Sequence, residues 1–245
     1  MTGILFGRFE LHVLPDGSEV YYDDSRHAYF SRIEERKTGW VGPKDARLPS
    51  PSTVAKVYDL QLADRLAGAA AKAGPEWFDR KDRRATEGTN VHEKVLEILA
   101  AGKRVPSLAD VTDAERGYAQ GVIAWWAKVK PKPIESELVV YSQAHRFAGR
   151  LDLLAEIDGK RTIVDLKTGF IGESAHVQLA GYELAAEECG YGPIDETLLL
   201  KVHDDGRFAA LPGLADPHDF VRGLRVYRKG KQLGQGVRAQ LKEAA

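Results

Sequence analysis

The 245-residue chain has a single cysteine, Cys189, and this scarcity excludes an internal disulfide and any zinc or iron–sulfur site built from four cysteines. The sequence has no apolar run near the roughly 20 residues that a membrane-spanning helix needs, and its N-terminal residues lack a signal-peptide pattern. A P-loop of the G-x-x-x-x-G-K-[ST] type is also missing, so no helicase motor is expected. These absences predict a cytoplasmic protein without a membrane partner.

Neither sign of charge dominates, because 35 basic residues face 36 acidic ones and the formal net charge is −1. A nucleic-acid partner would therefore need a local basic surface. Two basic runs are candidates for phosphate contacts, "FDRKDRRA" at 78–85 and "RGLRVYRKGK" at 222–231, although such runs are usually solvated faces. The aromatic candidates for base stacking are Trp77, Phe78, Trp125 and Trp126. Trp125 shares an apolar helical stripe with Tyr118, which favours a core position for both.

The order of patterns predicts an α/β (α+β) fold with a mixed sheet. Residues 1–50 form an N-terminal β-rich segment, with a turn signal at Asp16-Gly17. Residues 51–245 form the main domain, which divides into a helical lead-in over 51–130 and a core over 131–245. In the lead-in, Ser52 or Thr53 is expected to cap a helix that opens near Val54.

Within the core, strands are expected from Ile134 onward and a helix from about Ser174. A hairpin is expected to turn at Asp205-Gly206. A closing helix is expected over 216–230, capped by Asp216, and a capping box from Thr112 to Glu115 opens the helix before the core.

Two carboxylates interrupt the strand-like stretch "FAGRLDLLAEIDGKRTIVDLKTG" at 147–169. Asp158-Gly159 is a strong signal for a two-residue hairpin turn, which would place Asp152 directly opposite Asp165. Two opposed carboxylates need compensation, and a divalent cation bound by oxygen ligands fits best, with Lys167 on the same face. The alternative is that both carboxylates point into solvent, with Lys167 and Arg150 as surface partners.

At these residues the sequence resembles the PD-(D/E)XK nuclease superfamily, most closely its RecB-like branch of phage and CRISPR-associated nucleases. The resemblance covers roughly residues 85–185. It rests on four motifs in order: "GTNVHEKVLEIL" with His92, "GRLD" with Asp152, "VDLKTG" with Asp165 and Lys167, and "QLAGY" with Gln178 and Tyr182. It implies a restriction-endonuclease-like core, a mixed central sheet flanked by helices.

The resemblance also implies roles. His92, Asp152, Asp165 and the carbonyl of Leu166 would bind one or two Mg or Mn ions, and Asp152, Asp165 and Lys167 would be catalytic. Gln178, Tyr182, Arg150 and Thr168 would contact nucleic acid or support the site. Four of these residues also have an ordinary structural interpretation: His92 as a core histidine, Lys167 as a surface lysine, Gln178 as a helix-surface glutamine and Tyr182 as a half-buried tyrosine. Glu137 is either a further acidic ligand or, as we favour, a solvated strand residue. The single cysteine excludes the iron–sulfur cluster of some relatives.

The expected function is therefore a metal-dependent DNA exonuclease acting on single- or double-stranded DNA in phage recombination or DNA processing. If the chain is phage-encoded, it would act in the host cytoplasm, with a recombination or single-strand-binding protein as a further partner. Two rivals stay open: an endonuclease with the same residues, and a catalytically silent DNA-binding module. The sequence leaves RNA open as a substrate.

Overall fold

A computed structural model describes residues 4–59, 91, 95–102 and 108–243 of the chain. The predicted metal ligand His92, the basic run 78–85, and Trp77 and Phe78 lie outside these described residues. No helix in the described part is long and apolar enough to cross a membrane.

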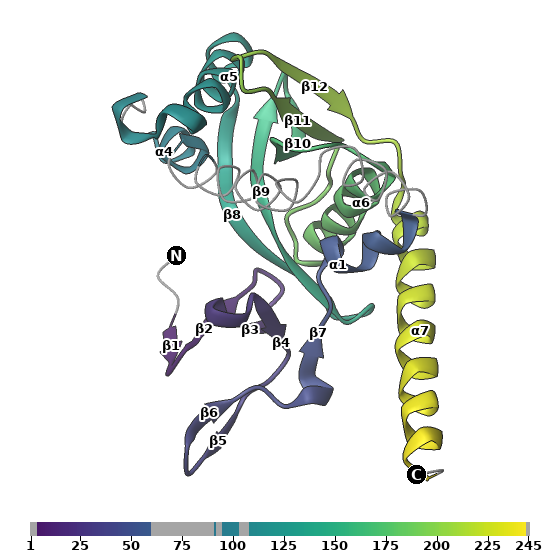
Figure 1. Cartoon of the computed structure of the whole chain (residues 1–245). Coiled ribbons are helices and arrows are strands. Elements are labelled where there is room, and N and C mark those ends of the chain that lie inside the picture. The colour runs from purple at the N-terminus through teal and green to yellow at the C-terminus, as the bar shows by residue number, and fades with distance from the viewer. Residues whose placement is uncertain (1–3, 60–90, 92–94, 103–107, 244–245) are drawn as a thin grey trace.

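The first fifty residues form a small antiparallel sheet, which confirms the β-rich prediction (Figure 1). Its strands, in spatial order, are β1 (Ile4–Phe6), β2 (Phe9–Val13), β3 (Glu19–Asp23), β4 (Ala28–Phe30) and β7 (Arg47–Leu48). A separate hairpin joins β5 (Glu34–Arg36) to β6 (Gly39–Val41), and two 3-10 turns occupy Asp24–Arg26 and Lys44–Ala46. Gly17 takes a left-handed φ of 81° in the predicted turn between β2 and β3.

The described helices are α1 (Pro51–Ala55), α4 (Glu97–Ala100), α5 (Asp113–Val129), α6 (Glu173–Glu188) and α7 (Pro217–Glu243), with 3-10 turns at Lys56–Tyr58 and Leu108–Asp110. The predicted cap of α1 was wrong: the helix begins three residues earlier, because Ser50 accepts the N–H of Thr53 and Pro51 occupies the first turn. The capping box of α5 is confirmed, with the N–H of Thr112 donating to Glu115 at 2.9 Å.

Helix α7 begins as predicted, since Asp216 accepts the N–H of Asp219 at 3.0 Å. Its predicted end near Gly230 was wrong, because the helix continues to Glu243. Gly230 is not among the residues with a positive φ. A glycine ends a helix when its backbone turns left-handed. A glycine that stays helical lowers the stability of the helix by only about 1 kcal/mol relative to alanine.

A mixed five-stranded sheet forms the core, as predicted. Its strand order is β12 (Phe208–Pro212), β11 (Glu196–Val202), β10 (Lys160–Lys167), β9 (Phe147–Ile157) and β8 (Lys132–Ser142). Strands β10 and β11 run parallel, joined through α6, and the other neighbours run antiparallel. Helices α1, α6 and α7 cover one face of the sheet, and α4 and α5 cover the other (Figure 1).

Strand alternation sends apolar side chains to both faces, and each face has its own buried cluster. On the α5 face, Tyr118, Val122 and Trp125 pack against strand residues such as Leu153 and Val164. This confirms the predicted core stripe and rules Trp125, 1% exposed, out as a base-stacking residue. On the α6 face, Leu154 and Ile163 pack against α6, α7 and the N-terminal sheet, which contributes Leu14, Val20, Tyr22, Tyr29 and Leu48.

Helix α5 approaches the β11–β12 turn so closely that one position accepts only glycine. A Cβ added at Gly117 would lie 1.6 Å from the main-chain oxygen of Asp204. We expect Gly117→Ala to lower the free energy of unfolding by about 1–3 kcal/mol, because the turn must move away. In a matched control, Gly230→Ala adds a Cβ with nothing within 4 Å and should stabilise the protein slightly. Urea denaturation measures both, and unchanged stability of Gly117→Ala would contradict this packing.

Candidate active site

The β9–β10 hairpin sets two carboxylates side by side. Asp158 and Gly159 both have positive φ, 51° and 78°, as a type I′ turn requires. Ile157 pairs with Lys160, and the register runs unbroken to Leu153 opposite Val164. The next position in that register puts Asp152 opposite Asp165. The predicted two-residue turn is therefore confirmed, and its register is confirmed as far as Leu153 and Val164, the residues next to the two carboxylates.

Asp165 is at the centre of a compact polar cluster. The residue is 1% exposed, so the alternative in which both carboxylates face solvent is wrong for it. Its Oδ2 lies 2.6 Å from Nζ of Lys167, and its Oδ1 accepts a hydrogen bond from Nε2 of Gln178 at 3.1 Å. A buried carboxylate needs such partners, because an uncompensated charge away from water is costly.

Lys167 is positively charged in this setting. Burial alone would lower the pKa of its ammonium group, but the negative charges of Asp165 and Asp152 outweigh burial and raise that pKa. Its side chain is 24% exposed, and its ammonium is held against Asp165. The arrangement makes Lys167 a fixed positive charge beside the two carboxylates.

Helix α6 supplies the side chains that hold this cluster. Gln178 donates from Nε2 to Asp165 and to the hydroxyl of Tyr182, the latter at 3.0 Å, and its Oε1 accepts from Lys167 at 3.4 Å. Gln178 and Tyr182 project together because they are four residues apart on one helix. Burial, with the charges of Asp165 and Asp152, raises the pKa of Tyr182 well above its usual value, so its hydroxyl stays protonated.

Asp152 is half-buried and bridges to the next strand. Its Oδ2 accepts the main-chain N–H of Leu166 at 2.6 Å. The N–H and C=O of a strand residue point toward the same neighbouring strand, so the Leu166 carbonyl is also directed toward β9. Two carboxylates and a carbonyl thus offer oxygen ligands on one part of the sheet, which is the donor type that Mg and Mn prefer.

This donor set fits a divalent cation, although the side chains described supply only part of a coordination shell. No group of three or more His, Cys, Asp or Glu side chains with metal-binding geometry occurs among the described residues. The third side-chain ligand expected from the sequence, His92, belongs to the part of the chain that is not described. The residues that would hold a cation here are therefore Asp152, Asp165 and the carbonyl of Leu166.

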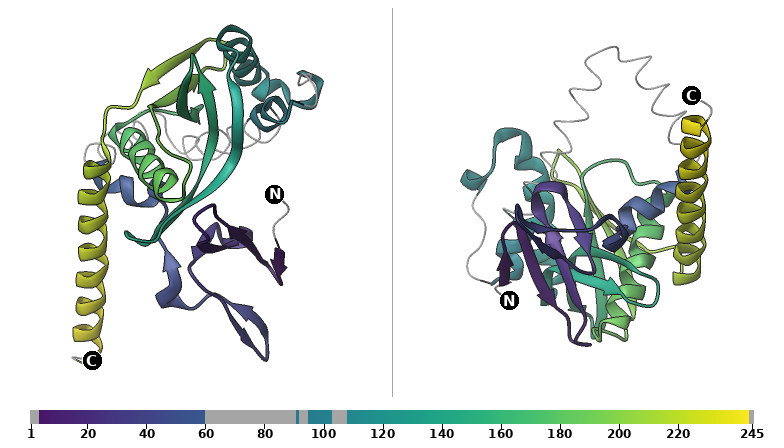
Figure 2. Two further views of the ribbon diagram at one scale, coloured as in Figure 1. Left: turned by 180° about the vertical axis from the view of Figure 1, so that it is seen from behind. Right: turned by 90° about the horizontal axis from the view of Figure 1, so that it is seen from below.

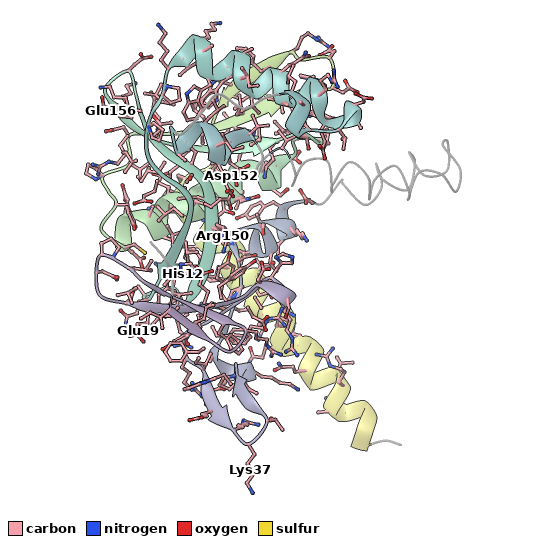
Figure 3. All side chains as sticks on the ribbon, turned by 90° about the vertical axis from the view of Figure 1, so that its left-hand side faces the viewer. His12, Glu19, Lys37, Arg150, Asp152 and Glu156 are labelled. Atoms are coloured by element: carbon pink, nitrogen blue, oxygen red, sulfur yellow. The ribbon has the colours of Figure 1, made fainter. Side chains whose placement is uncertain are left out.

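Arg150 and Thr168 lie at the edges of the cluster and are not part of its hydrogen-bond network. The Arg150 guanidinium stacks over the ring of Tyr22, 4.5 Å from its centroid, on the side of the N-terminal sheet that carries His12 (Figure 3). Its Nε is buried and has no hydrogen-bond partner among the described residues. Thr168 follows β10 directly, and its carbonyl accepts from Nζ of Lys201 at 2.6 Å.

One residue near the site, Lys201, was not recognised from the sequence. Lys201 pairs with Lys167 across the parallel β10–β11 ladder and holds the turn after β10 through the carbonyls of Thr168 and Gly169. A lysine in an apolar strand was the only signal. Glu137 lies in β8, is half-buried and has a left-handed φ of 49°; its assignment as a solvated strand residue rather than a metal ligand stays a prediction.

Comparison with models of protein families gives a match that covers most of the chain. The family model described as the PD-(D/E)XK nuclease superfamily matches residues 27–220. The matched range includes β9, β10 and α6, which carry the cluster described above. No protein of curated function is similar enough to count as a match.

Proposed function

The chain belongs to the PD-(D/E)XK nuclease superfamily, and from that premise we propose that it is a metal-dependent DNA exonuclease of the RecB-like branch. The observation that carries the proposal is the contact of Lys167 with buried Asp165, next to Asp152, on one face of the hairpin. Two adjacent carboxylates can hold a divalent cation, and a fixed positive charge beside them can stabilise charge on a reacting phosphate, so this arrangement suits phosphodiester hydrolysis. Its DNA substrate would be single- or double-stranded, in recombination or DNA processing.

In this proposal Asp152, Asp165 and the Leu166 carbonyl hold one or two Mg or Mn ions, with His92 as a further ligand. When bound, the cation supplies Lewis acidity that activates water and stabilises charge on the phosphate and the leaving oxygen. Gln178 keeps the Asp165 carboxylate in place through its 3.1 Å hydrogen bond. Tyr182 orients Gln178 in turn, through its own hydroxyl.

Lys167 is the residue that would act on the substrate directly. Its ammonium donates to a non-bridging oxygen of the scissile phosphate and so stabilises the negative charge that develops there. The water oxygen bonds to phosphorus and its proton passes to solvent, while the ester bond to the leaving oxygen breaks and that oxygen takes up a proton from solvent. The products are a phosphate end and a hydroxyl end. Arg150 and Thr168 support the site from its two edges.

The deciding experiment is cleavage of end-labelled linear DNA and of circular DNA, each with Mg, Mn or EDTA. We expect cleavage with Mg or Mn and none with EDTA, because the carboxylates depend on the cation for catalysis. Laddering from one end of linear DNA with intact circles supports the exonuclease, and cut circles support the endonuclease. Absence of cleavage of DNA and RNA with either metal would overturn the proposal and favour a silent binding module.

A further inference from the structure

A second site lies away from the carboxylate cluster. A pocket of about 680 Å³ opens between α7 and the β4–β7 side of the N-terminal sheet, and Figures 1 and 2 show β7 as the strand of that sheet nearest to α7. Three separate segments line it with cationic side chains: Lys44 and Arg47, Arg146 of the β8–β9 turn, and Arg228 and Lys231 of α7. We call these five residues and the space between them the basic groove.

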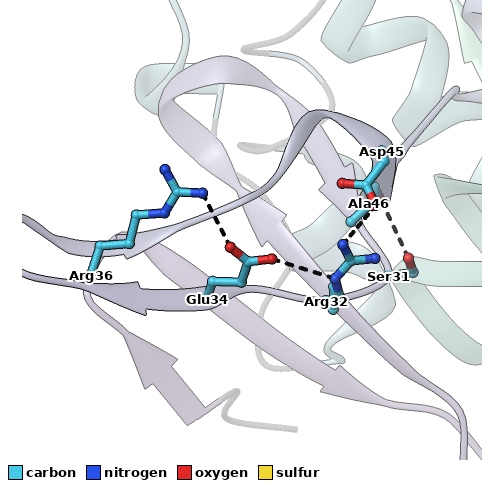
Figure 4. Close-up of polar contacts among 6 residues, drawn as sticks. All are labelled: Ser31, Arg32, Glu34, Arg36, Asp45 and Ala46. Atoms are coloured by element: carbon cyan, nitrogen blue, oxygen red, sulfur yellow. Dashed lines mark hydrogen bonds and ion pairs between the residues drawn. The ribbon is translucent and has the colours of Figure 1, made fainter.

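The charge of the basic groove is not neutralised by its own walls. Asp45 is the one carboxylate among the described residues that line it, and Arg32 holds that carboxylate at 2.6 Å (Figure 4). Within the described part of the chain, none of the five cationic side chains forms an ion pair. Five positive charges therefore converge on a space that offers them no free carboxylate.

Two of these arginines are held close together in spite of their like charge. Arg228 donates from Nη2 to the main-chain carbonyls of His145 and Arg146. Partial burial lowers the pKa of Arg228, and the positive charge of Arg146 lowers it further. The fold thus fixes a repulsive pair at the mouth of the groove, and an anion bound there would relieve that repulsion.

The helix that forms one wall is itself strongly basic. Residues 220–242 contain seven lysines and arginines and no acidic residue, in a chain whose net charge is −1. Tyr227 also lines the groove, with Nζ of Lys231 5.6 Å from its ring centroid, so an aromatic surface accompanies the charges. Spaced cations with an aromatic face are the combination that recognises a nucleic-acid strand rather than a single phosphate ion.

The start of α1 connects the basic groove with the active site. Ser50 and Thr53 line the groove. Pro51, between them, is wedged against β9 and α6: a Cβ added at Gly149 would meet Pro51 at 2.6 Å and Tyr182 at 2.9 Å. Tyr182 is the residue whose hydroxyl holds Gln178 beside Asp165. A strand seated in the groove would therefore pass the edge of the layer that carries the catalytic cluster.

We propose that the basic groove binds the phosphodiester backbone of a DNA strand that the active site processes. This inference rests on the proposed function for the identity of the strand. Arg47 and Lys231 contribute from opposite walls, and both are exposed. Each phosphate neutralised contributes about 0.7–0.9 to the slope of log affinity against log salt.

The test is fluorescence anisotropy of a labelled 20-nucleotide strand with the full chain in EDTA, over a salt series. The groove variant is Arg47→Gln with Lys231→Gln. The matched control, Lys37→Gln with Lys56→Gln, removes two exposed charges that lie off the groove. We expect the groove variant to bind about tenfold more weakly at low salt, with a slope smaller by about 1.5, and the control to lose less than about threefold.

Equal losses of DNA affinity in both variants, or no DNA binding by the wild type, would overturn the proposal that the groove binds DNA. Far-ultraviolet circular dichroism and Tm verify that both variants fold. The proposed function is judged separately, by wild-type cleavage with Mg or Mn. If groove binding holds without cleavage, only the proposed function fails. If cleavage occurs and the groove variant binds normally, only this inference fails.

Discussion

Replacing Asp165 with asparagine should lower the rate of DNA cleavage at least about 10³-fold and leave the fold intact. The variant keeps the shape of the side chain and an oxygen for Gln178, but it removes the charge that holds both the cation and Lys167. DNA binding in EDTA should persist or strengthen, because one negative charge near the phosphate is gone. Cleavage is measured with Mg and Mn, and binding by anisotropy.

The matched control is Asp158→Asn, in the exposed turn of the same hairpin, where asparagine accepts the left-handed φ of 51°. It should cleave at the wild-type rate. Adding Mn should raise the Tm of the wild type and of the control but not that of Asp165→Asn, since a ligand stabilises only a protein that binds it. Undiminished cleavage by Asp165→Asn would remove this carboxylate from the mechanism.

Replacing Lys167 with methionine should lower kcat by about 10²–10³-fold and change the Kd for DNA little. The reason is that the ammonium opposes charge that develops only as the phosphate reacts, whereas a backbone contact would act on the bound substrate equally. Single-turnover cleavage measures the effect on the chemical step, and binding in EDTA measures the effect on DNA affinity. The variant also leaves buried Asp165 without its ion-pair partner, so a lower Tm is expected without metal.

Lys160→Met is the corresponding control on the same strand. Lys160 is exposed and pairs with Glu196 at the surface, and such solvent-screened pairs contribute little to stability. Its kcat should match the wild type. If Lys167→Met instead weakened DNA binding and left kcat unchanged, the lysine would be a substrate-binding group rather than a catalytic one.

The hairpin could be predicted from the sequence because a two-residue turn fixes the register of every pair that follows. Asp158-Gly159 therefore set the pairing up to Leu153 and Val164, next to Asp152 and Asp165, without knowledge of the rest of the fold. The burial of Asp165 could not be predicted in this way. Strand alternation says which residues share a face, but only the packing of α6 on that face removes it from water.

The position of Lys201 shows where such reasoning stops. Its pairing with Lys167 belongs to the parallel β10–β11 ladder, whose strands are joined by a long connection through α6. A crossover of that length does not set the register of the strands it joins, in contrast to a tight turn. The basic groove could be predicted only in part: the run at 222–231 was a candidate for phosphate contacts, but the other cations of the groove come from two segments distant in the sequence.

The N-terminal sheet has a practical consequence for protein engineering. Leu14, Val20, Tyr22, Tyr29 and Leu48 complete the same buried cluster as α6 and the central strands. A truncation at residue 51 would expose that apolar surface to water, and exposed patches of this kind promote aggregation. The segment is therefore expected to be an integral part of the scaffold rather than a removable module.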